Sequence, residues 1–154
     1  MFKLVNIPID TLNVKEDFAS GSAGAFACFE GWVRNEHQGK TVIALEYEAI
    51  EVLCRSEAQK ILNEAKEKFG AITVKCVHRI GKLEIGEIAI WIGVTAAHRN
   101  SAFKACQYII DQIKLRLPIW KKEYYADGAS QWVNCAQAQT PSISDATSWQ
   151  EQKL

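Results

Sequence analysis

The chain has 154 residues, of which 48% are hydrophobic and 23% are charged, and this composition predicts a single domain over 1–154 with a substantial core. Its 18 basic and 18 acidic residues cancel, which excludes a molecule-wide field that would attract nucleic acid or an anionic membrane. We find no secretory-signal pattern and no apolar run long enough to cross a bilayer, so we expect a cytoplasmic protein.

The first part of the chain predicts two strands and one short helix. Residues 2–7 form a short apolar stretch that is stopped by a proline, which is typical of a strand. Asn13 begins a capping-box pattern, and this pattern predicts a short helix over 13–19. Residues 25–33 (AFACFEGWV) are rich in aromatic and β-compatible residues and predict a strong strand, with Gly31 as a bulge or a point of close approach.

A polar loop, 34–40 (RNEHQGK), follows this strand and leads to a return strand over 41–49. Binding groups are often mounted on loops that rigid strands hold in place. Arg34 is the residue we select, because it sits at the strand end, where its position would be fixed. The alternative is an ordinary solvated hairpin turn.

The middle of the chain predicts a helix over 52–69, followed by two strands. Gly70 is placed to be the left-handed residue at the end of this helix. Strands are expected over 71–79 and 87–95, the second central in its sheet because it is almost continuously apolar, with a turn over 80–86 between them. The buried face of the helix is expected to contain Leu53, Ala58, Ile61, Leu62, Ala65 and Phe69.

The segment 94–124 organises the chain. Asn100 is a good N-cap for a helix over 100–117, and Pro118 ends that helix because it lacks an N–H donor. Tyr108 and Leu115 lie on its expected outer face and indicate a dimer contact or another layer. Apolar residues at steps of three and four predict a buried stripe of Phe103, Cys106, Ile110, Ile113 and Leu117.

Basic residues flank this helix on both sides. His98 and Arg99 precede its N-terminus, where free N–H groups and the helix dipole favour an anion. Lys114 lies at the edge of the apolar stripe, where partial desolvation would lower its pKa. Lys121 and Lys122 follow the proline. We therefore predict one hollow in which an anion cradle meets two or three amines.

Each of these signals also has a simpler explanation. A lysine such as Lys114 at a helix edge is usually a surface residue whose charged end reaches water. His98 is explained equally by a polar cap or a satisfied core residue, and Arg99 by pairing with a carboxylate. The prediction of a site depends on the convergence of these residues on one segment.

A final hairpin over 119–125 and 130–135 is expected around Asp127 and Gly128, followed by a loose tail over 136–154. Strands and helices mix without strict alternation. The sequence therefore predicts the α+β class, with a mostly antiparallel sheet and two main helices.

The five cysteines are odd in number and widely spaced. No C-x-x-C pair and no Cys/His cluster of zinc spacing occurs, so we expect neither a disulfide scaffold nor a metal site. Most of the cysteines fall in predicted strands or helices, where a thiol behaves as a small buried hydrophobe. Cys28 is retained as an alternative catalytic nucleophile.

Three blocks of sequence resemble a known family. They are GWVRNEHQG, VHRIGKLEIGE and GVTAAHRNSAFKACQYIIDQIKLRLPIWKKE, which fall within roughly 24–133 in consistent order and spacing. Together they resemble the large, catalytic subunit of molybdopterin synthase. The pattern HR-S-A-F…K…P-x-W-K-[KR]-E in the last block is its most specific part.

This resemblance implies an α/β-hammerhead fold and a homodimer that binds two copies of a small ubiquitin-like sulfur-carrier subunit, giving a heterotetramer. The carrier's C-terminal Gly-Gly tail, bearing a thiocarboxylate, would enter a pocket of the large subunit. Two sulfur transfers would then convert cyclic pyranopterin monophosphate into the dithiolene of molybdopterin, a step of molybdenum cofactor biosynthesis. No cofactor is implied, because the sulfur arrives on the partner.

The resemblance also implies roles for individual residues. Lys114 matches the family lysine beside the partner's terminal glycine, and it would stabilise charge or move a proton there. Lys121 would act as a general acid. The cyclic phosphate would pair with Arg34, His98 and Arg99. The catalytic residues are thus Lys114 and Lys121. The substrate-binding residues are Trp32, Val33, Arg34, His98, Arg99, Lys114, Lys121, Lys122 and Glu123.

Two departures and two alternatives accompany this resemblance. Trp32 stands where a smaller or basic residue is expected, and Gln131 stands where an arginine is expected. One alternative is a non-catalytic scaffold that binds the small subunit. The other is a different phosphate-ligand enzyme that uses Cys28. The sequence does not determine which lysine is the acid, the order of the two transfers, or whether two subunits share the pocket.

Overall fold

The computed structural model describes residues 1–134, so the expected tail over 136–154 lies outside the described residues. It contains two sheets, with strand orders β1-β5-β7-β2 and β3-β4-β8-β9, and β6 also pairs with β4. The strands are β1 (Phe2–Val5), β2 (Ala25–Trp32), β3 (Glu36–His37), β4 (Lys40–Ala49), β5 (Ala71–Arg79), β6 (Gly81–Glu84), β7 (Ile88–Ala96), β8 (Ile119–Tyr125) and β9 (Ser130–Asn134). The helices are the short 3₁₀ helix η1 (Ile9–Thr11), α1 (Glu51–Phe69) and α2 (Arg99–Arg116).

The predicted α+β class with two main helices is confirmed. The strand pairs are antiparallel, apart from β1 and β5, which run parallel. β7 lies inside its sheet between β5 and β2, as its apolar sequence predicted. α1 ends where expected, because Gly70 adopts a left-handed conformation with φ 68°.

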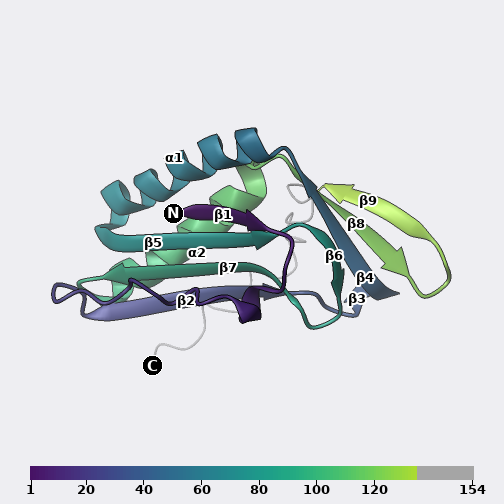
Figure 1. Ribbon diagram of the computed structural model, residues 1–154, viewed down its shortest axis with the longest axis horizontal. Helices are drawn as coiled ribbons and strands as arrows, with labels where there is room; N and C mark the ends of the chain where they lie inside the picture. The colour runs from purple at the N-terminus through teal and green to yellow at the C-terminus, as the bar shows by residue number, and fades with distance from the viewer. Residues whose placement is uncertain (135–154) are drawn as a thin grey trace, which may run out of the picture.

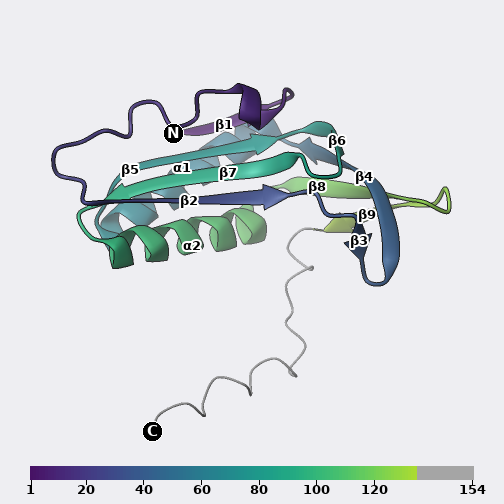
Figure 2. The same ribbon diagram turned by 90° about the horizontal axis from the view of Figure 1, so that it is seen from below.

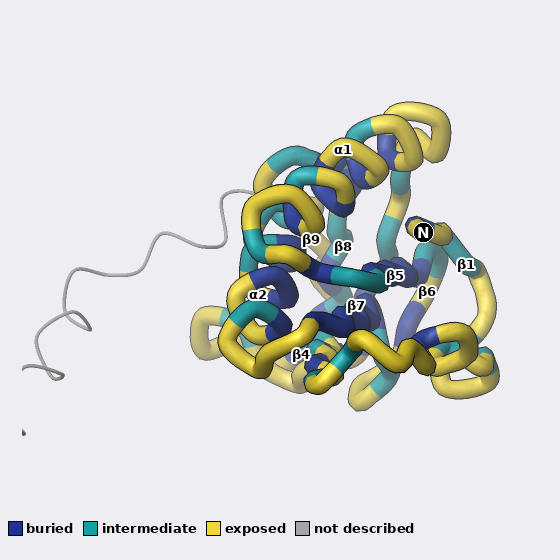
Figure 3. The backbone as a smooth tube through the Cα atoms, turned by 90° about the vertical axis from the view of Figure 1, so that its left-hand side faces the viewer, coloured by how far each residue is buried: buried dark blue, intermediate teal, exposed yellow. Residues whose placement is uncertain are grey.

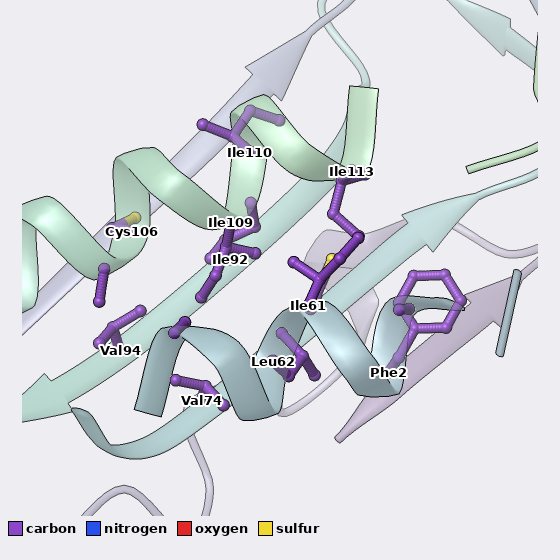
Figure 4. Close-up of a cluster of buried hydrophobic side chains, with 14 of the residues drawn as sticks. Phe2, Ile61, Leu62, Val74, Ile92, Val94, Cys106, Ile109, Ile110 and Ile113 are labelled. Atoms are coloured by element: carbon purple, nitrogen blue, oxygen red, sulfur yellow. The ribbon is translucent and has the colours of Figure 1, made fainter. Parts of the chain in front are cut away.

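The main core lies between the four-stranded sheet and the two helices, which cover the same face of that sheet (Figures 1 and 2). Ile61 and Leu62 of α1 meet Ile109 and Ile113 of α2 over Ile92 of β7 (Figure 4). Burying each such side chain contributes about 1.5–3 kcal/mol. The exposed turns of both helices lie on the outside of this layer (Figure 3).

The other face of this sheet is covered by the segment between β1 and β2. Ile9 and Phe18 pack there with Val77 and Trp91 in a second apolar cluster. The predicted helix over 13–19 is wrong: residues 14–17 form turns, and Asp17 has a left-handed φ of 64°. A helix cannot continue through a residue of that conformation.

The buried face of α2 matches the predicted stripe at Cys106, Ile110, Ile113 and Leu117, and departs from it at Phe103. Phe103 is 64% exposed, whereas Ala102, Ala105 and Ile109 are fully buried. The two alanines belong to the core cluster, whereas Phe103, which follows Ala102, lies outside it. The predicted N-cap is also wrong, because α2 begins at Arg99 and its N-cap residue is His98, not Asn100.

Three further sequence expectations need correction. Leu53, expected on the buried face of α1, is 53% exposed because α1 buries Cys54, Ala58 and their neighbours instead. Tyr108 does not face outward: its ring packs against Phe69, between the two helices. The expected turn over 80–86 contains the strand β6, which pairs with β4.

The second sheet extends from one end of the first (Figure 1). The strand β4 forms its spine, with β3 and β6 on one edge and β8 on the other. The predicted final hairpin is confirmed as β8 and β9. Within residues 1–134, α1 and α2 are both too polar to cross a membrane.

Candidate active site

A cavity of about 340 Å³ lies where the two sheets meet, a volume at the lower end of the range of small-molecule sites. The C-terminal end of α2 forms one wall, the end of β2 a second, and β4 with β8 a third. Its apolar lining includes Phe29, Ile110 and Leu117. The polar side chains that line it are Arg34, Glu36, His37, Tyr47, His78, Lys114, Lys121 and Glu123.

The strand β8 places two charged residues against this cavity. Lys121 and Glu123 are two residues apart on β8, so their side chains share one face of the sheet. The Lys121 ammonium lies 2.7 Å from Oε1 of Glu123. Glu123 is 1% exposed, so this ion pair is formed at the wall of the cavity and not in bulk water.

Three donors surround the Glu123 carboxylate. Besides Lys121 at Oε1, the Oε2 atom accepts a hydrogen bond from the Tyr125 hydroxyl at 2.7 Å and lies 2.8 Å from Nδ1 of His37. Burial alone would raise the pKa of Glu123, but the hydrogen bonds from Lys121, Tyr125 and His37 together lower it below its ordinary value. The carboxylate is therefore ionised near neutral pH.

Lys114 reaches the same cavity from α2, near a buried histidine. The Nδ1–H of His78 donates to the carbonyl of Arg79 at 2.8 Å, and its ring stacks edge-on against Tyr47. Burial, partly offset by that hydrogen bond, lowers the pKa of His78 to about 4, and the Lys114 ammonium acts in the same direction. His78 is thus a neutral lining group at pH 7.

The end of β2 supplies the next wall. Trp32 and Arg34 both line the cavity. Trp32 is 65% exposed, and its Nε1–H donates a hydrogen bond to Glu30 at 3.0 Å. Val33 does not line the cavity and is buried in a small apolar cluster with Leu83 and Tyr125. Gly31 carries the predicted bulge, since the pairing of β2 with β7 shifts register between Gly31 and Trp32.

The predicted meeting of all the basic residues in one hollow does not occur within one chain. His98 and Arg99 lie at the N-terminal end of α2, whereas Lys114 lies near its C-terminal end. Fifteen residues separate Arg99 from Lys114, and at about 1.5 Å per residue their Cα atoms are roughly 22 Å apart. Helical geometry alone therefore separates the two groups.

Lys122 is also separated from the cavity. It alternates with Lys121 on β8, so its side chain lies on the opposite face of the sheet. Its ammonium lies 5.2 Å from the ring centre of Tyr124 and 5.6 Å from that of Trp132. Lys122 therefore makes cation–π contacts on the outer face of the sheet.

Sequence reasoning missed His37 and His78, which line the cavity, and Tyr125, which binds Glu123 without lining the cavity itself. His37 was included in a polar loop, His78 was taken as a strand end, and Tyr125 was not selected. A period-two reading of β8 would have grouped Lys121, Glu123 and Tyr125 on one face. His37 and His78 had no local signal, because their contacts are to residues distant in sequence.

The arrangement combines fixed positive charge with a sheltered volume. Lys114, Lys121 and Arg34 surround a space into which an anion or an extended peptide end would fit. Among residues 1–134, no three His, Cys, Asp or Glu side chains gather in a way that would hold a metal ion. The chemistry available from these residues is proton transfer and the stabilisation of negative charge.

Comparison with known proteins identifies the family. The family described as "MoaE protein" matches residues 4–116. The molybdopterin synthase catalytic subunit of Synechococcus elongatus is 44% identical over 115 residues, covering 73% of this chain and 70% of that protein. The crystal structure of molybdopterin synthase from Staphylococcus aureus superposes with a TM-score of 0.79 at 39% identity, covering 86% of this chain and 96% of that one.

A more distant structure shares the fold. The complex of subunits 1 and 2 of molybdopterin-converting factor from Helicobacter pylori contains a chain that superposes with a TM-score of 0.70 at 23% identity, covering 88% of this chain and 90% of that one. Because the family matches most of the chain, and because a relative far above 30% identity spans more than two thirds of it, this chain belongs to the MoaE protein family.

Proposed function

We propose that this chain is the catalytic subunit of a molybdopterin synthase. In this reaction, sulfur passes from the C-terminal thiocarboxylate of a small ubiquitin-like protein to cyclic pyranopterin monophosphate and forms the dithiolene of molybdopterin. The observation that carries the proposal is that Lys114 and Lys121, distant on α2 and β8, line one cavity. Family membership supplies the reaction.

Each lysine has a separate task in this proposal. Lys114 contacts the thiocarboxylate of the partner's tail and stabilises negative charge as the sulfur attacks. Lys121 donates a proton to the oxygen that leaves the substrate, and its ion pair with Glu123 holds its ammonium in place. Arg34, at the wall formed by β2, pairs with the substrate's phosphate.

Glu123 has a supporting task. Both of its oxygens are bound by protein donors, Oε1 by Lys121 and Oε2 by His37 and Tyr125. It therefore holds Lys121 and does not bind the substrate in this proposal. Val33 and Lys122 similarly act through structure, since Val33 is buried in an apolar cluster and Lys122 lies on the outer face of β8.

The partner is a small protein whose C-terminal Gly-Gly tail enters the cavity. The Helicobacter pylori protein of the same fold was solved in a complex of subunits 1 and 2 of molybdopterin-converting factor. We propose that this chain forms a homodimer which binds two such partners, and that His98 and Arg99 reach the substrate from the second copy. A cytoplasmic location fits the free thiols of Cys28, Cys54, Cys76 and Cys106.

The test is dithiolene formation by Lys114→Ala and Lys121→Ala with partner already loaded with sulfur. Each substitution is expected to lower the rate by about 100-fold or more, which is the usual contribution of a general acid or charge-stabilising group. Lys104→Ala is the matched control, because Lys104 is an exposed lysine on α2. Full activity in both lysine variants would end the proposal.

The same assay, applied to the wild type and to Cys28→Ser, separates the two alternatives. A non-catalytic scaffold would bind the loaded partner with unchanged affinity and yield no product in the wild type. An enzyme using Cys28 would lose turnover in Cys28→Ser. The cavity disfavours this second alternative, because among residues 1–134 its walls are formed by other side chains and Cys28 lies outside them.

A further inference from the structure

We propose that His37 is a positioning residue of the reaction: it holds the Glu123 carboxylate, which in turn holds the Lys121 ammonium. This inference rests on the proposed function, because it assigns a task to a residue of the same cavity. His37 is not among the site residues that the sequence pattern or the family resemblance indicates.

The position of His37 is fixed by a tight turn. β3 and β4 form a hairpin in which His37 pairs with Lys40. The two residues between them, Gln38 and Gly39, have φ values of 50° and 76°. Two successive left-handed residues are typical of the type I′ turn, whose twist matches that of the flanking strands. The hairpin therefore holds the imidazole with little freedom.

The imidazole of His37 meets a carboxylate that water cannot easily solvate. His37 Nδ1 and Glu123 Oε2 are 2.8 Å apart, and the side chain of Glu123 is 2% exposed. Because Glu123 is ionised, Nδ1 must carry the hydrogen and donate it. A neutral imidazole is sufficient for this bond, so the role does not depend on the charge of His37.

The opposite oxygen of the same carboxylate sets the position of Lys121. Oε1 of Glu123 is 2.7 Å from Lys121 Nζ, while His37 and Tyr125 share Oε2. Two donors on Oε2 fix the rotation of the carboxylate about its last bond. When one donor is lost, the carboxylate turns more freely and the ammonium of Lys121 loses its fixed location.

The first experiment measures Lys121 without any substrate. Wild type, His37→Leu and His37→Asn are briefly acetylated, and the labelling of Lys121 relative to the exposed Lys104 is read by mass spectrometry. We expect His37→Leu to raise the relative labelling of Lys121 about threefold to tenfold, as the loss of one hydrogen bond to a charged group implies. His37→Asn restores most of the protection, because its amide N–H can replace Nδ1.

The second experiment measures turnover with sulfur-loaded partner. His37→Leu should lower kcat about fivefold to tenfold and leave the partner's Kd within about twofold, since His37 acts on Lys121 and not on the docked tail. His37→Asn should recover most of kcat. Thr41→Val is the control, because Thr41 is an exposed residue of the same hairpin, outside the cavity, and it should match wild type in both readouts.

The labelling result tests the role of His37, and the activity of the lysine variants tests the proposed function. Unchanged Lys121 labelling in folded His37→Leu overturns this inference, whatever the activity of the variant. Full activity of Lys121→Ala overturns the proposed function instead. If His37→Leu does not fold, as judged by circular dichroism, His37→Ala replaces it, because this change adds no volume to the hairpin, and the same labelling result decides.

Discussion

At the scale of the residue, the buried carboxylate of Glu123 binds three protein donors. It brings together donors from a hairpin and a strand, His37 on β3 and Lys121 and Tyr125 on β8. Tyr125 shows the reciprocal effect: the hydrogen bond to Glu123, with burial, raises the pKa of its hydroxyl to about 12. Glu123 and Tyr125 therefore stabilise each other in the protonation states that form this hydrogen bond.

Glu123→Gln removes the charge while keeping the shape of the side chain. The Lys121 ammonium would then lack its counter-ion beside the cavity, so we expect the free energy of unfolding at neutral pH to fall by about 2–4 kcal/mol. Urea unfolding followed by circular dichroism measures this difference. Equal stability of variant and wild type at neutral pH would contradict the role given to the carboxylate.

The sign of the pH dependence follows from the lowered pKa of Glu123. A carboxyl group with a depressed pKa in the folded state contributes stability that is complete above its unfolded pKa of about 4.3. This contribution is lost as the pH falls through the folded value. The difference between wild type and Glu123→Gln should therefore narrow below about pH 4.

His78 gives a second prediction, in a higher pH range. Its pKa is about 4 when folded and about 6.5 when unfolded, so the unfolded chain binds more protons between these values. Stability therefore falls as the pH drops, by about 2 kcal/mol from this group between about pH 7.5 and pH 5. Urea unfolding of wild type and His78→Gln should show a shallower pH slope in the variant. Identical slopes would mean that His78 is charged in the folded protein.

At the scale of the element, one face of β8 carries the residues of the site and the other face lies on the outside of the sheet. Lys121, Glu123 and Tyr125 face the cavity side, while Lys122 lies with Tyr124 and Trp132 on the other face. Pro118 makes this possible, because it ends α2 directly before β8 begins at Ile119. The short connection places the helix lysine and the strand lysine on the same cavity.

The bulge of β2 lies at the wall of the cavity, which Gly31 and Trp32 both line. A Cβ atom on Gly31 would lie 2.7 Å from Cγ2 of Ile90, which is an overlap with a stiff, β-branched side chain. Gly31→Ala is therefore expected to lower the free energy of unfolding by about 1–3 kcal/mol. Chemical denaturation measures the change.

Gly21→Ala provides the matched control for this substitution. A Cβ atom on Gly21 would meet nothing within 4 Å, so its free energy of unfolding should stay within about 0.5 kcal/mol of wild type. If Gly31→Ala were as stable as Gly21→Ala, the close approach of β2 and β7 at the bulge would not constrain the fold.

At the scale of the whole molecule, the two ends of α2 pose a question of assembly. Arg99 and Lys114 cannot act on the same small substrate within one chain, because α2 holds them roughly 22 Å apart. In a symmetric dimer, however, one copy can bring its His98 and Arg99 to the cavity of the other. The site would then be incomplete in a monomer.

Mixing two inactive variants tests this arrangement. When Lys114→Ala and Arg99→Ala chains are unfolded together and refolded, half of the dimers are mixed, and each mixed dimer has one intact site. We expect dithiolene formation to recover to about a quarter of the wild-type rate. No recovery, with mixed dimers confirmed by native mass spectrometry, would show that the sites are not shared. An active Arg99→Ala variant would remove Arg99 from the site.

The sequence by itself determined what depends on local pattern. The period of α1, the left-handed Gly70, the bulge at Gly31 and the end of α2 at Pro118 follow from rules that act within a few residues. The local pattern also selected Lys114 and Lys121, and the resemblance added the family and the roles of these lysines, because the spacing of residues along the chain carries that information. The hydrophobic period failed at two residues that were expected on the buried faces of the helices. Phe103 of α2 and Leu53 of α1 are both exposed.

The tertiary structure alone decided which of these groups meet. It joined His37 to Glu123 across 86 positions of sequence, placed the neutral His78 in the same cavity, and separated Arg99 from Lys114 along a rigid helix. Such contacts have no local signal, because they depend on how two sheets and a helix are packed together. A cavity is a property of this packing, and so the site became visible when the chain was folded.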